Sequence, residues 1–324
     1  MTGAARLHLE DVFRARRVLA RHLPPTPLRA AFCLRPLPAY LKLECWQPTG
    51  SFKVRGATNF IASLSAEQRR SGVVAASAGN HALGVAHAVA ILGGNVEATL
   101  FVPRTAPRSK VEKLRAFAVT VREDGETYDE AHALALAHCE KTGATYVHAF
   151  DDPRTAAGQG TVAIEILEEM PHVGTIVVPV GGGGLIAAVA AAVKDRAPTA
   201  RIVAVQPEAS PALRDSIREG RALLDYAAAP TLADGLAGGI GEIVFAHRDL
   251  IDEVVVVPEA AIEDAIVALI AEDQVVAEGS GAVGVAALRA GLVESAKDGR
   301  PVIAIVTGGN IDAPVLARLL QRRY

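Results

Sequence analysis

Short runs of apolar residues alternate with segments of helical spacing along most of the chain. The runs are rich in Val, Ile and Ala and are bounded by Gly or Pro, as in strands that are buried on both faces of a sheet. We predict such strands over residues 73–76, 96–102, 118–121, 144–147, 175–179, 201–205, 254–257 and 301–306. Between them, apolar positions three and four residues apart predict helices, among them residues 79–92, 128–141 and 153–170.

The beginning of the chain predicts a helix, then a strand that ends in a sharp turn. Residues 9–23 have helical spacing, and a pair of prolines follows them as a stop signal. A strand is expected over residues 40–43, and the sequence Gln-Pro-Thr-Gly at residues 47–50 breaks it. Residues 51–53 are then expected to form the first turn of a helix.

This alternation predicts an α/β fold with parallel sheets that helices cover on both faces. The chain of 324 residues is too long for one small core and suits two domains. Its composition shows no break, so we place the boundary by topology. A smaller unit over residues 72–150 is expected to be inserted into a larger one made of residues 1–71 and 151–324.

Composition and charge exclude several classes of protein. Apolar residues make up 50% of the chain and charged residues 21%, which is typical of a globular protein. The formal net charge is −3 and no block of Lys or Arg stands out, so we expect no nucleic-acid partner. Three widely spaced cysteines without a Cys-x-x-Cys pair argue against a disulfide framework or a zinc site.

We expect a cytoplasmic protein without a membrane segment. The first 23 residues carry charges throughout and lack the apolar core of a signal peptide. Residues 171–193 contain no Asp, Glu, Lys or Arg, but a proline and four consecutive glycines would leave polar backbone groups unpaired in lipid. This stretch is therefore expected to form a strand, a glycine turn and a buried helix.

Lys53 is the first candidate for a chemical role. It stands behind a tight turn and next to the aromatic residue Phe52, in the sequence KLECWQPTGSFKVRGA. Most lysines in the first turn of a helix are solvated surface residues. A lysine amine in such a setting can instead form a Schiff base with an aldehyde cofactor.

The second candidate lies where a predicted strand ends and a helix begins, and it comprises Ser77, Ala78, Gly79, Asn80 and His81. Backbone N–H groups at a helix N-terminus are free and the helix dipole favours an anion, so a substrate carboxylate would fit there. Taken alone, the motif is explained better by an ordinary Ser or Asn helix cap.

The third candidate is a run of glycines after the predicted strand 175–179, namely Gly181, Gly182, Gly183 and Gly184, followed by Leu185. Glycine backbone can fold around a phosphate and direct its N–H groups inward at a helix N-terminus. No Gly-Lys-Ser/Thr follows, so this is not a Walker A loop. A dinucleotide fingerprint also fails, because Ile186 and Gln206 stand where a glycine and an acidic residue are needed.

The fourth candidate is Thr307-Gly308-Gly309-Asn310 after the last predicted strand, at the sheet edge where ligands bind in α/β proteins. A simple glycine turn before a helix is a serious alternative. Glu278, which precedes another helix, is either an acid near a helix cap or a residue of the site.

In this order, the motifs resemble those of the threonine/serine dehydratase branch of the fold type II pyridoxal-phosphate (PLP) enzymes. The resemblance covers nearly the whole chain and is carried by PTPL (25–28), KLECWQPTGSFKVRGA (42–57), ASAGNHALGVA (76–86), AGQGT (157–161), VGGGGLIAAVA (180–190), TLADGLAGG (231–239), AEGSGAVGVAAL (277–288) and TGGNID (307–312). It implies two doubly wound three-layer domains with parallel sheets, the smaller inserted in the larger. It also implies a homodimer or a higher homo-oligomer.

The resemblance assigns a role to each candidate. Lys53, beside Phe52, would hold the PLP aldehyde as a Schiff base, Asn80 would bind the ring hydroxyl, and Thr307 would face the pyridine nitrogen. Gly181 to Gly184, with Leu185, would cradle the phosphate. Ser77, Ala78, Gly79, Asn80 and His81 would bind the substrate carboxylate.

The implied reaction is a β-elimination that converts L-threonine, L-serine or both to a 2-oxo acid and ammonia. An amino-acid racemase or a hydroxyaspartate dehydratase of the same family is the alternative, and a nucleotide-binding protein is a more distant one. The similar racemases carry a serine directly before Gly-Asn-His, where this chain has Ala78. Elimination is therefore favoured over racemisation.

The chain departs from the family pattern at several positions. Gly279 stands where many relatives have proline, and Thr307 replaces a more usual serine. Gln206 stands where relatives that bind a divalent cation have glutamate, so we expect no metal. Only 14 residues follow Thr-Gly-Gly-Asn, so a C-terminal regulatory domain is not expected.

Overall fold

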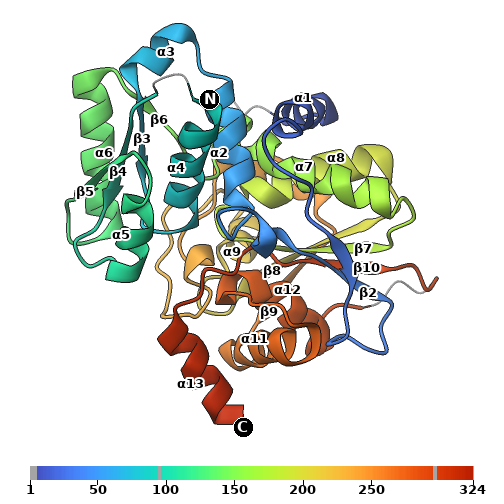
Figure 1. Cartoon of the computed structure of the whole chain (residues 1–324). Helices are drawn as coiled ribbons and strands as arrows, with labels where there is room; N and C mark the ends of the chain where they lie inside the picture. Colours follow the sequence, from blue (N-terminus) through green and yellow to red (C-terminus); the bar gives the residue numbers. More distant parts are fainter. Residues whose placement is uncertain (1–5, 94–95, 295–297, 324) are drawn as a thin grey trace.

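A six-stranded sheet forms the centre of the larger unit in the computed structural model, which describes residues 6–93, 96–294 and 298–323 (Figure 1). Its strands, in spatial order, are β1 (Leu28–Ala30), β2 (Ala39–Lys42), β10 (Val302–Ile305), β7 (Thr175–Pro179), β8 (Arg201–Pro207) and β9 (Glu253–Val257). All neighbouring strands are parallel except β1, which pairs antiparallel with β2 at the edge.

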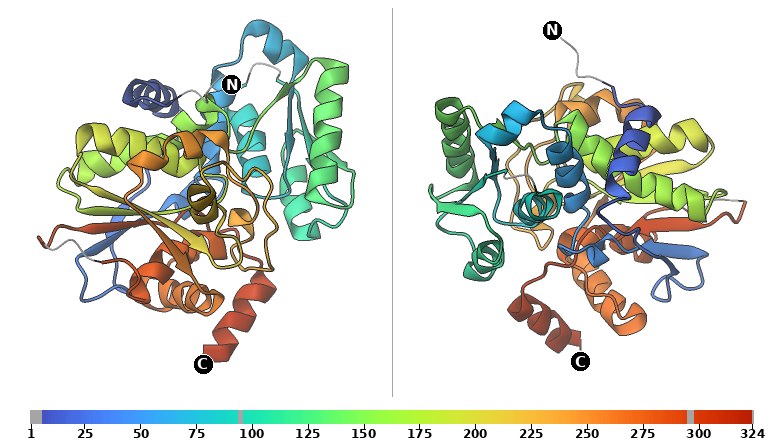
Figure 2. Two further views of the ribbon diagram at one scale, coloured as in Figure 1. Left: turned by 180° about the vertical axis from the view of Figure 1, so that it is seen from behind. Right: turned by 45° about the horizontal axis from the view of Figure 1, so that its top comes forward.

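Helices cover both faces of this sheet (Figures 1 and 2). One face is packed by α1 (Leu9–Leu19), α7 (Pro153–Glu169) and α8 (Gly184–Arg196), and the other by α11 (Glu259–Asp273) and α12 (Gly279–Arg289). Three further helices are α9 (Ala212–Glu219), α10 (Glu242–Ala246) and α13 (Ala313–Arg323), and single 3-10 turns lie at Glu44–Trp46, Asp234–Leu236 and Arg248–Leu250. The buried strands carry Val, Ile and Ala on both sides, since neither face meets water.

The smaller unit holds a four-stranded parallel sheet in the order β5 (Thr120–Glu123), β4 (Ala98–Val102), β3 (Val73–Ala76) and β6 (Thr145–Tyr146). Its helices are α4 (Asn80–Leu92), α5 (Arg108–Arg115) and α6 (Tyr128–Thr142), and the short helix α3 (Ala66–Ser71) directly precedes it in the chain. Helix α2 (Lys53–Ala62) lies between the two sheets, and its Ala57, Phe60 and Ile61 pack into the core of the smaller one. The extent of the smaller unit, residues 72–150, stays a proposal.

The predicted fold class is confirmed: the smaller sheet is parallel, the larger one is parallel except for its edge strand β1, helices cover both, and the smaller unit is inserted in the chain of the larger. The uncharged stretch 171–193 forms strand β7, the glycine turn and helix α8, as predicted. The predicted strand 118–121 was placed two residues too early, because edge strand β5 is mostly exposed and its apolar residues are a weak guide. No helix within the described ranges is long and apolar enough to cross a membrane.

Helices α2 and α7 cross in backbone contact, and two glycines allow it. A Cβ added at Gly158 would lie 2.7 Å from the Arg55 carbonyl oxygen and 2.7 Å from the Cα of Gly56. A Cβ at Gly56 would in turn lie 2.6 Å from the Thr155 carbonyl oxygen. Neither helix can accept a side chain at the crossing without moving. Because α2 begins with Lys53, such a movement would also displace this lysine.

We predict that Gly158→Ala destabilises the fold by about 1–3 kcal/mol, because the added methyl group forces α2 and α7 apart. Gly284→Ala on α12 is the matched control, since its Cβ would meet only ordinary contacts, the nearest at 3.4 Å. The control should gain about 0.5–1 kcal/mol from the better helix propensity of alanine. Urea unfolding measures both changes. Equal stability of the two variants would refute the close crossing.

Candidate active site

The turn before Lys53 is tied to the end of the last strand of the large sheet. The Phe52 N–H donates to the Thr307 carbonyl oxygen at 3.0 Å, and the Gly309 N–H donates to the Gly50 carbonyl oxygen at 2.9 Å. Helix α2 therefore begins at Lys53 directly beside the carboxyl end of β10, the edge at which ligands bind in open α/β sheets.

The amine of Lys53 is partly buried and has one hydrogen-bond partner among the described residues. Its Nζ donates to the Ala149 carbonyl oxygen at 3.0 Å and lies 5.2 Å from the centroid of the Phe52 ring. Burial lowers the pKa of Lys53 to about 8. On the order of a tenth of the amine is then uncharged at pH 7, against roughly one in three thousand for an ordinary lysine. A nucleophilic or basic role needs that uncharged form.

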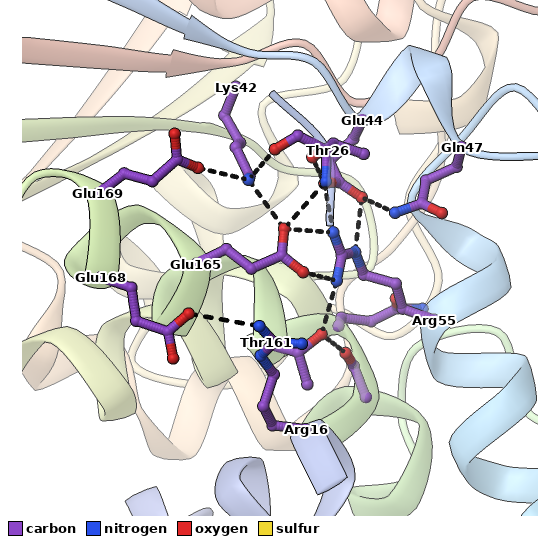
Figure 3. A network of polar contacts seen from close by, with 12 residues as sticks. Arg16, Thr26, Lys42, Glu44, Gln47, Arg55, Thr161, Glu165, Glu168 and Glu169 are labelled. Carbon is purple, nitrogen blue, oxygen red and sulfur yellow. Dashed lines mark hydrogen bonds and ion pairs between the residues drawn. The ribbon is translucent and has the colours of Figure 1, made fainter. Parts of the chain in front are cut away.

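A buried cluster of four charged residues holds α2 in place, and Figure 3 shows it from close by. The Arg55 guanidinium donates two hydrogen bonds to Glu44, at 2.7 and 2.8 Å, and two to Glu165, at 2.7 and 2.8 Å. The Nζ of Lys42 lies 2.8 Å from Glu165. Two positive and two negative groups balance, and each is at most 2% exposed. The cluster joins the end of β2, helix α2 and helix α7.

The pKa of Glu165 reflects this cluster. Burial by itself would raise that pKa, but the hydrogen bonds and charge of Arg55, together with Lys42, outweigh burial and hold it below its ordinary value. The carboxylate therefore stays ionised, as the two cations require.

The four glycines form the turn into α8 and leave no room for side chains. A Cβ at Gly182 would lie 2.3 Å from the Phe150 ring, and one at Gly183, whose φ is +89°, would lie 2.3 Å from Val244. Gly183 is the cap residue of α8 and no side chain caps this helix. The N–H groups of the first turn of α8, including that of Leu185, are therefore not paired with a capping side chain. A helix N-terminus of this kind suits an anion.

A second uncapped helix N-terminus belongs to α4, which begins at Asn80. Its cap residue is Gly79, which has no side chain that could cap the helix. The Ser77 hydroxyl accepts from the Gly79 N–H at 3.1 Å. Ala78 is partly exposed in this turn. The Ser77 side chain thus shapes the loop rather than capping the helix, and the N-terminal N–H groups of α4 can meet a carboxylate.

Asn80 joins the two units through its side chain. Its Nδ2 donates to Glu278 Oε1 at 2.6 Å, and its Oδ1 accepts from Asn310 Nδ2 at 2.7 Å. Burial raises the pKa of Glu278 to about 7, although the hydrogen bond from Asn80 opposes that rise. Thr307 is buried nearby, and its hydroxyl donates to the Ser280 carbonyl oxygen at 3.2 Å.

The structure brings most of the predicted residues together through these contacts. Lys53 lies beside Thr307 through the Phe52–Thr307 hydrogen bond, and residues 149–150 contact both Lys53 and the glycine turn. His81 is also close: burial, followed by the charge of Lys53, lowers its pKa to about 3, and its Nε2 lies 2.8 Å from the Val147 carbonyl oxygen.

Two parts of the site were missed or left open in the sequence. The loop 147–151 contributes the Ala149 carbonyl oxygen at Lys53 and the Phe150 ring at the glycine turn, but no apolar period or polar motif distinguishes it. Glu278 was left undecided and lies at the site, hydrogen-bonded to Asn80. Its signal was an acidic residue within a stretch otherwise free of charge, AEGSGAVGVAAL.

The donor set fits a PLP molecule. The site offers an amine with a lowered pKa at Lys53, an uncapped glycine N-terminus at α8 for a phosphate, and Asn80 with Thr307 for polar atoms of a ring. His81 Nδ1 is a buried polar atom without a hydrogen-bond partner among the described residues. These are the groups that an aldehyde, a phosphate and an aromatic ring with a hydroxyl would need.

In the part of the chain that the structure describes, no three His, Cys, Asp or Glu residues are grouped to hold a cation. Gln206 is buried, and its Oε1 accepts from Leu213 and Arg214 N–H groups at 2.9 and 3.1 Å. The Gln206 amide oxygen therefore pairs with free N–H groups at the N-terminus of α9.

Comparisons with known proteins show which family the chain resembles. A family model described as pyridoxal-phosphate dependent enzyme matches residues 19–308. The L-threonine ammonia-lyase of Thermotoga maritima is 46% identical over 97% of this chain and 78% of its own. Among solved structures, the processed threonine deaminase isoform 2 of Solanum lycopersicum has a TM-score of 0.88 at 35% identity, covering 99% of this chain and 94% of its own. Maize serine racemase has a TM-score of 0.89 at 32% identity, with 98% of each chain covered.

We predict that Arg55→Met destabilises the fold by about 3–5 kcal/mol, because it leaves Glu44 and Glu165 buried without a partner. Arg16→Met is the matched control: Arg16 pairs at 3.3 Å with Glu168, on the same helix as Glu165, but the Glu168 side chain is 58% exposed. Loss of that pair should cost less than about 1 kcal/mol.

Urea unfolding at pH 7 measures both variants. A cost for Arg55→Met no larger than that of the Arg16 control would show that the buried cluster does not hold α2.

Proposed function

The chain belongs to the family of pyridoxal-phosphate dependent enzymes, and we propose that it is an ammonia-lyase that converts L-threonine to 2-oxobutanoate and ammonia. The observation that carries the proposal is the setting of Lys53: a partly buried amine with a pKa of about 8, which donates to the Ala149 carbonyl oxygen at the start of α2, beside the carboxyl end of β10. The relationship to an L-threonine ammonia-lyase at 46% identity supports the choice of substrate.

PLP, when bound, withdraws electrons from the α-carbon of an amino acid and so eases the loss of its proton and of a β-hydroxyl group. In this proposal Lys53 holds the cofactor, and the glycine turn Gly181 to Gly184 with Leu185 binds its phosphate. Asn80 and Thr307 hold its ring. The N–H groups at the start of α4 bind the substrate carboxylate, with Ser77 and Gly79 shaping that turn.

The substrate's own amine would first replace Lys53 on the cofactor and set the lysine amine free. Lys53 would then serve as the base that takes the Cα proton, because its amine is uncharged in a useful fraction of molecules near neutral pH. The Ala149 carbonyl oxygen, at 3.0 Å, orients that amine. The β-hydroxyl would leave as water by taking up one proton, which balances the proton that Lys53 removes from Cα. The enamine that remains is hydrolysed by water to the 2-oxo acid and ammonia. The reaction is a carbon–oxygen elimination.

We also propose a second substrate, a location and an oligomeric state for the protein. L-serine is expected as a second substrate, since it also carries a β-hydroxyl. We propose a cytoplasmic location, in keeping with the free cysteines Cys33, Cys45 and Cys139. We also propose a homodimer, which the exposed apolar side chains of Phe32 and Trp46 support.

A racemase is the competing function, because maize serine racemase has a similar structure. Racemisation needs an acid or base on each face of the planar carbanion. Lys53 serves one face. Ala78, directly before Gly79-Asn80-His81, carries no proton that it could deliver to the other face. Ser77 lies one residue earlier, and its hydroxyl oxygen is held in the loop by accepting from the Gly79 N–H. The residues therefore favour elimination.

We predict that Lys53→Ala removes the visible absorption of the purified holoenzyme and lowers 2-oxo acid formation by at least about a thousandfold, since it removes both attachment point and base. Lys141→Ala, at an exposed position of α6, is the control and should change neither. The assay offers L-threonine, L-serine and 3-hydroxyaspartate and measures 2-oxo acid and ammonia. Wild-type protein that releases neither product from any of them would refute the lyase.

We predict that the wild type forms little D-serine and that Ala78→Ser raises the ratio of racemisation to elimination, because it places a hydroxyl where the second acid or base is needed. Ala76→Ser, at the buried end of strand β3, is the control and should leave that ratio unchanged. Chiral chromatography of serine after partial turnover measures the ratio. Substantial D-serine from the wild type would move the function to racemase.

A further inference from the structure

The loop 147–151, which leads from β6 to α7, touches three parts of the site. Its Ala149 carbonyl oxygen accepts from Lys53 Nζ at 3.0 Å. Its Phe150 ring packs on the glycine turn so closely that a Cβ at Gly182 would lie 2.3 Å from it. Its Val147 carbonyl oxygen lies 2.8 Å from His81 Nε2. The path of this short loop therefore fixes the direction of the Lys53 amine and the shape of the glycine turn.

One side chain of the loop, that of His148, binds the loop's own backbone. The His148 Nδ1 accepts from the Asp151 N–H at 2.9 Å and from the Phe150 N–H at 3.3 Å. Its ring also meets the Phe150 ring edge to face, with centroids 4.7 Å apart. Two N–H groups can donate to Nδ1 only if that nitrogen keeps its lone pair, so the imidazole must be uncharged.

We propose that His148 is a positioning residue of the site: its uncharged imidazole holds the loop 147–151 so that Ala149 meets Lys53 and Phe150 meets Gly182. Protonation of Nδ1 turns the acceptor into a donor that faces two N–H groups, and the loop is released. The geometry of the loop stands by itself, and only the effect on turnover rests on the proposed function.

The surroundings of His148 favour the uncharged form. Burial lowers the pKa of His148 below its ordinary value of 6.5. Titratable groups face the ring from several elements: Asp151 and Asp152 raise this pKa, His132 of α6 and Lys53 of α2 lower it, and Tyr146 of β6 and His81 of α4 are also close. Burial and the two basic side chains outweigh the carboxylates.

The sign of the pH effect follows from this lowered pKa. Above pH 6.5 His148 is uncharged in the folded and unfolded chains, so the acceptor bonds are intact. As the pH falls below 6.5, the unfolded chain takes up its proton first, and the stabilisation by these bonds declines. It is lost once the pH passes through the lower pKa of the folded chain. The loop is therefore ordered at neutral pH and released in acid.

Two substitutions of His148 separate the effect of its hydrogen-bond acceptor, Nδ1, from the effect of its protonation. His148→Asn places an amide oxygen near the position of Nδ1, which accepts hydrogen bonds but takes up no proton in this range. His148→Phe keeps a ring but has no acceptor. The readout is hydrogen–deuterium exchange of the Phe150 and Asp151 amides in the holoenzyme between pH 5 and 8, corrected for the intrinsic pH dependence of exchange.

We expect wild-type protection of these amides to fall at least about tenfold on acidification below pH 6.5, because each pH unit below a pKa changes the protonation ratio tenfold. His148→Asn should keep its protection throughout, and His148→Phe should lack it even at pH 8. The acid limb of the kcat profile should be flatter in His148→Asn than in the wild type. Glu278, with a pKa of about 7, would also act on a turnover profile, but its hydrogen bond is to Asn80 and not to these amides, so the exchange measurement separates it from His148.

The inference is overturned if the wild type and His148→Asn lose protection in parallel, or if His148→Phe retains wild-type protection at pH 8. If His148→Phe does not fold, the comparison of wild type with His148→Asn decides alone. A wild type that forms no 2-oxo acid would refute the proposed function, while the exchange measurement would still decide the role of His148.

Discussion

The arrangement of the molecule depends on a buried, charge-balanced cluster at the base of helix α2. Arg55 forms paired hydrogen bonds with Glu44 and with Glu165, and Lys42 neutralises the second carboxylate (Figure 3). Such a cluster tolerates only a narrow range of geometries, because each charge would be costly if it were left unpaired out of water. The orientation of α2 is thereby set, and Lys53 lies two residues before Arg55, on the helix turn that faces the site.

The rest of the site is built largely from backbone. The turn before Lys53 pairs with the loop after β10, the glycine turn opens α8, and Gly79 opens α4. Main-chain groups at helix N-termini supply anion sites without any charged side chain. Two of the side chains that complete the site, Lys53 and Glu278, have pKa values that burial moves toward neutrality, which is where proton transfer is efficient.

Much of this could be predicted from the sequence because the signals are local. Apolar runs located the buried strands, and the glycine run and Lys53 motif lay where strands end. The structure added what depends on pairs distant in the chain. Arg55 and Glu165 are 110 residues apart, and Asn80 and Glu278 are 198 apart, so no spacing rule connects them. The loop 147–151 has no motif, and its importance comes only from what lies beside it.

The central claim is that Lys53 is the amine that holds the cofactor. Borohydride reduction of the purified protein in the presence of PLP, followed by proteolysis and peptide mass spectrometry, tests it most directly. The account predicts a phosphopyridoxyl group on the peptide that contains Lys53 and on no other lysine in stoichiometric amount. A stoichiometric label on a different lysine, or no label at saturating PLP, would contradict it.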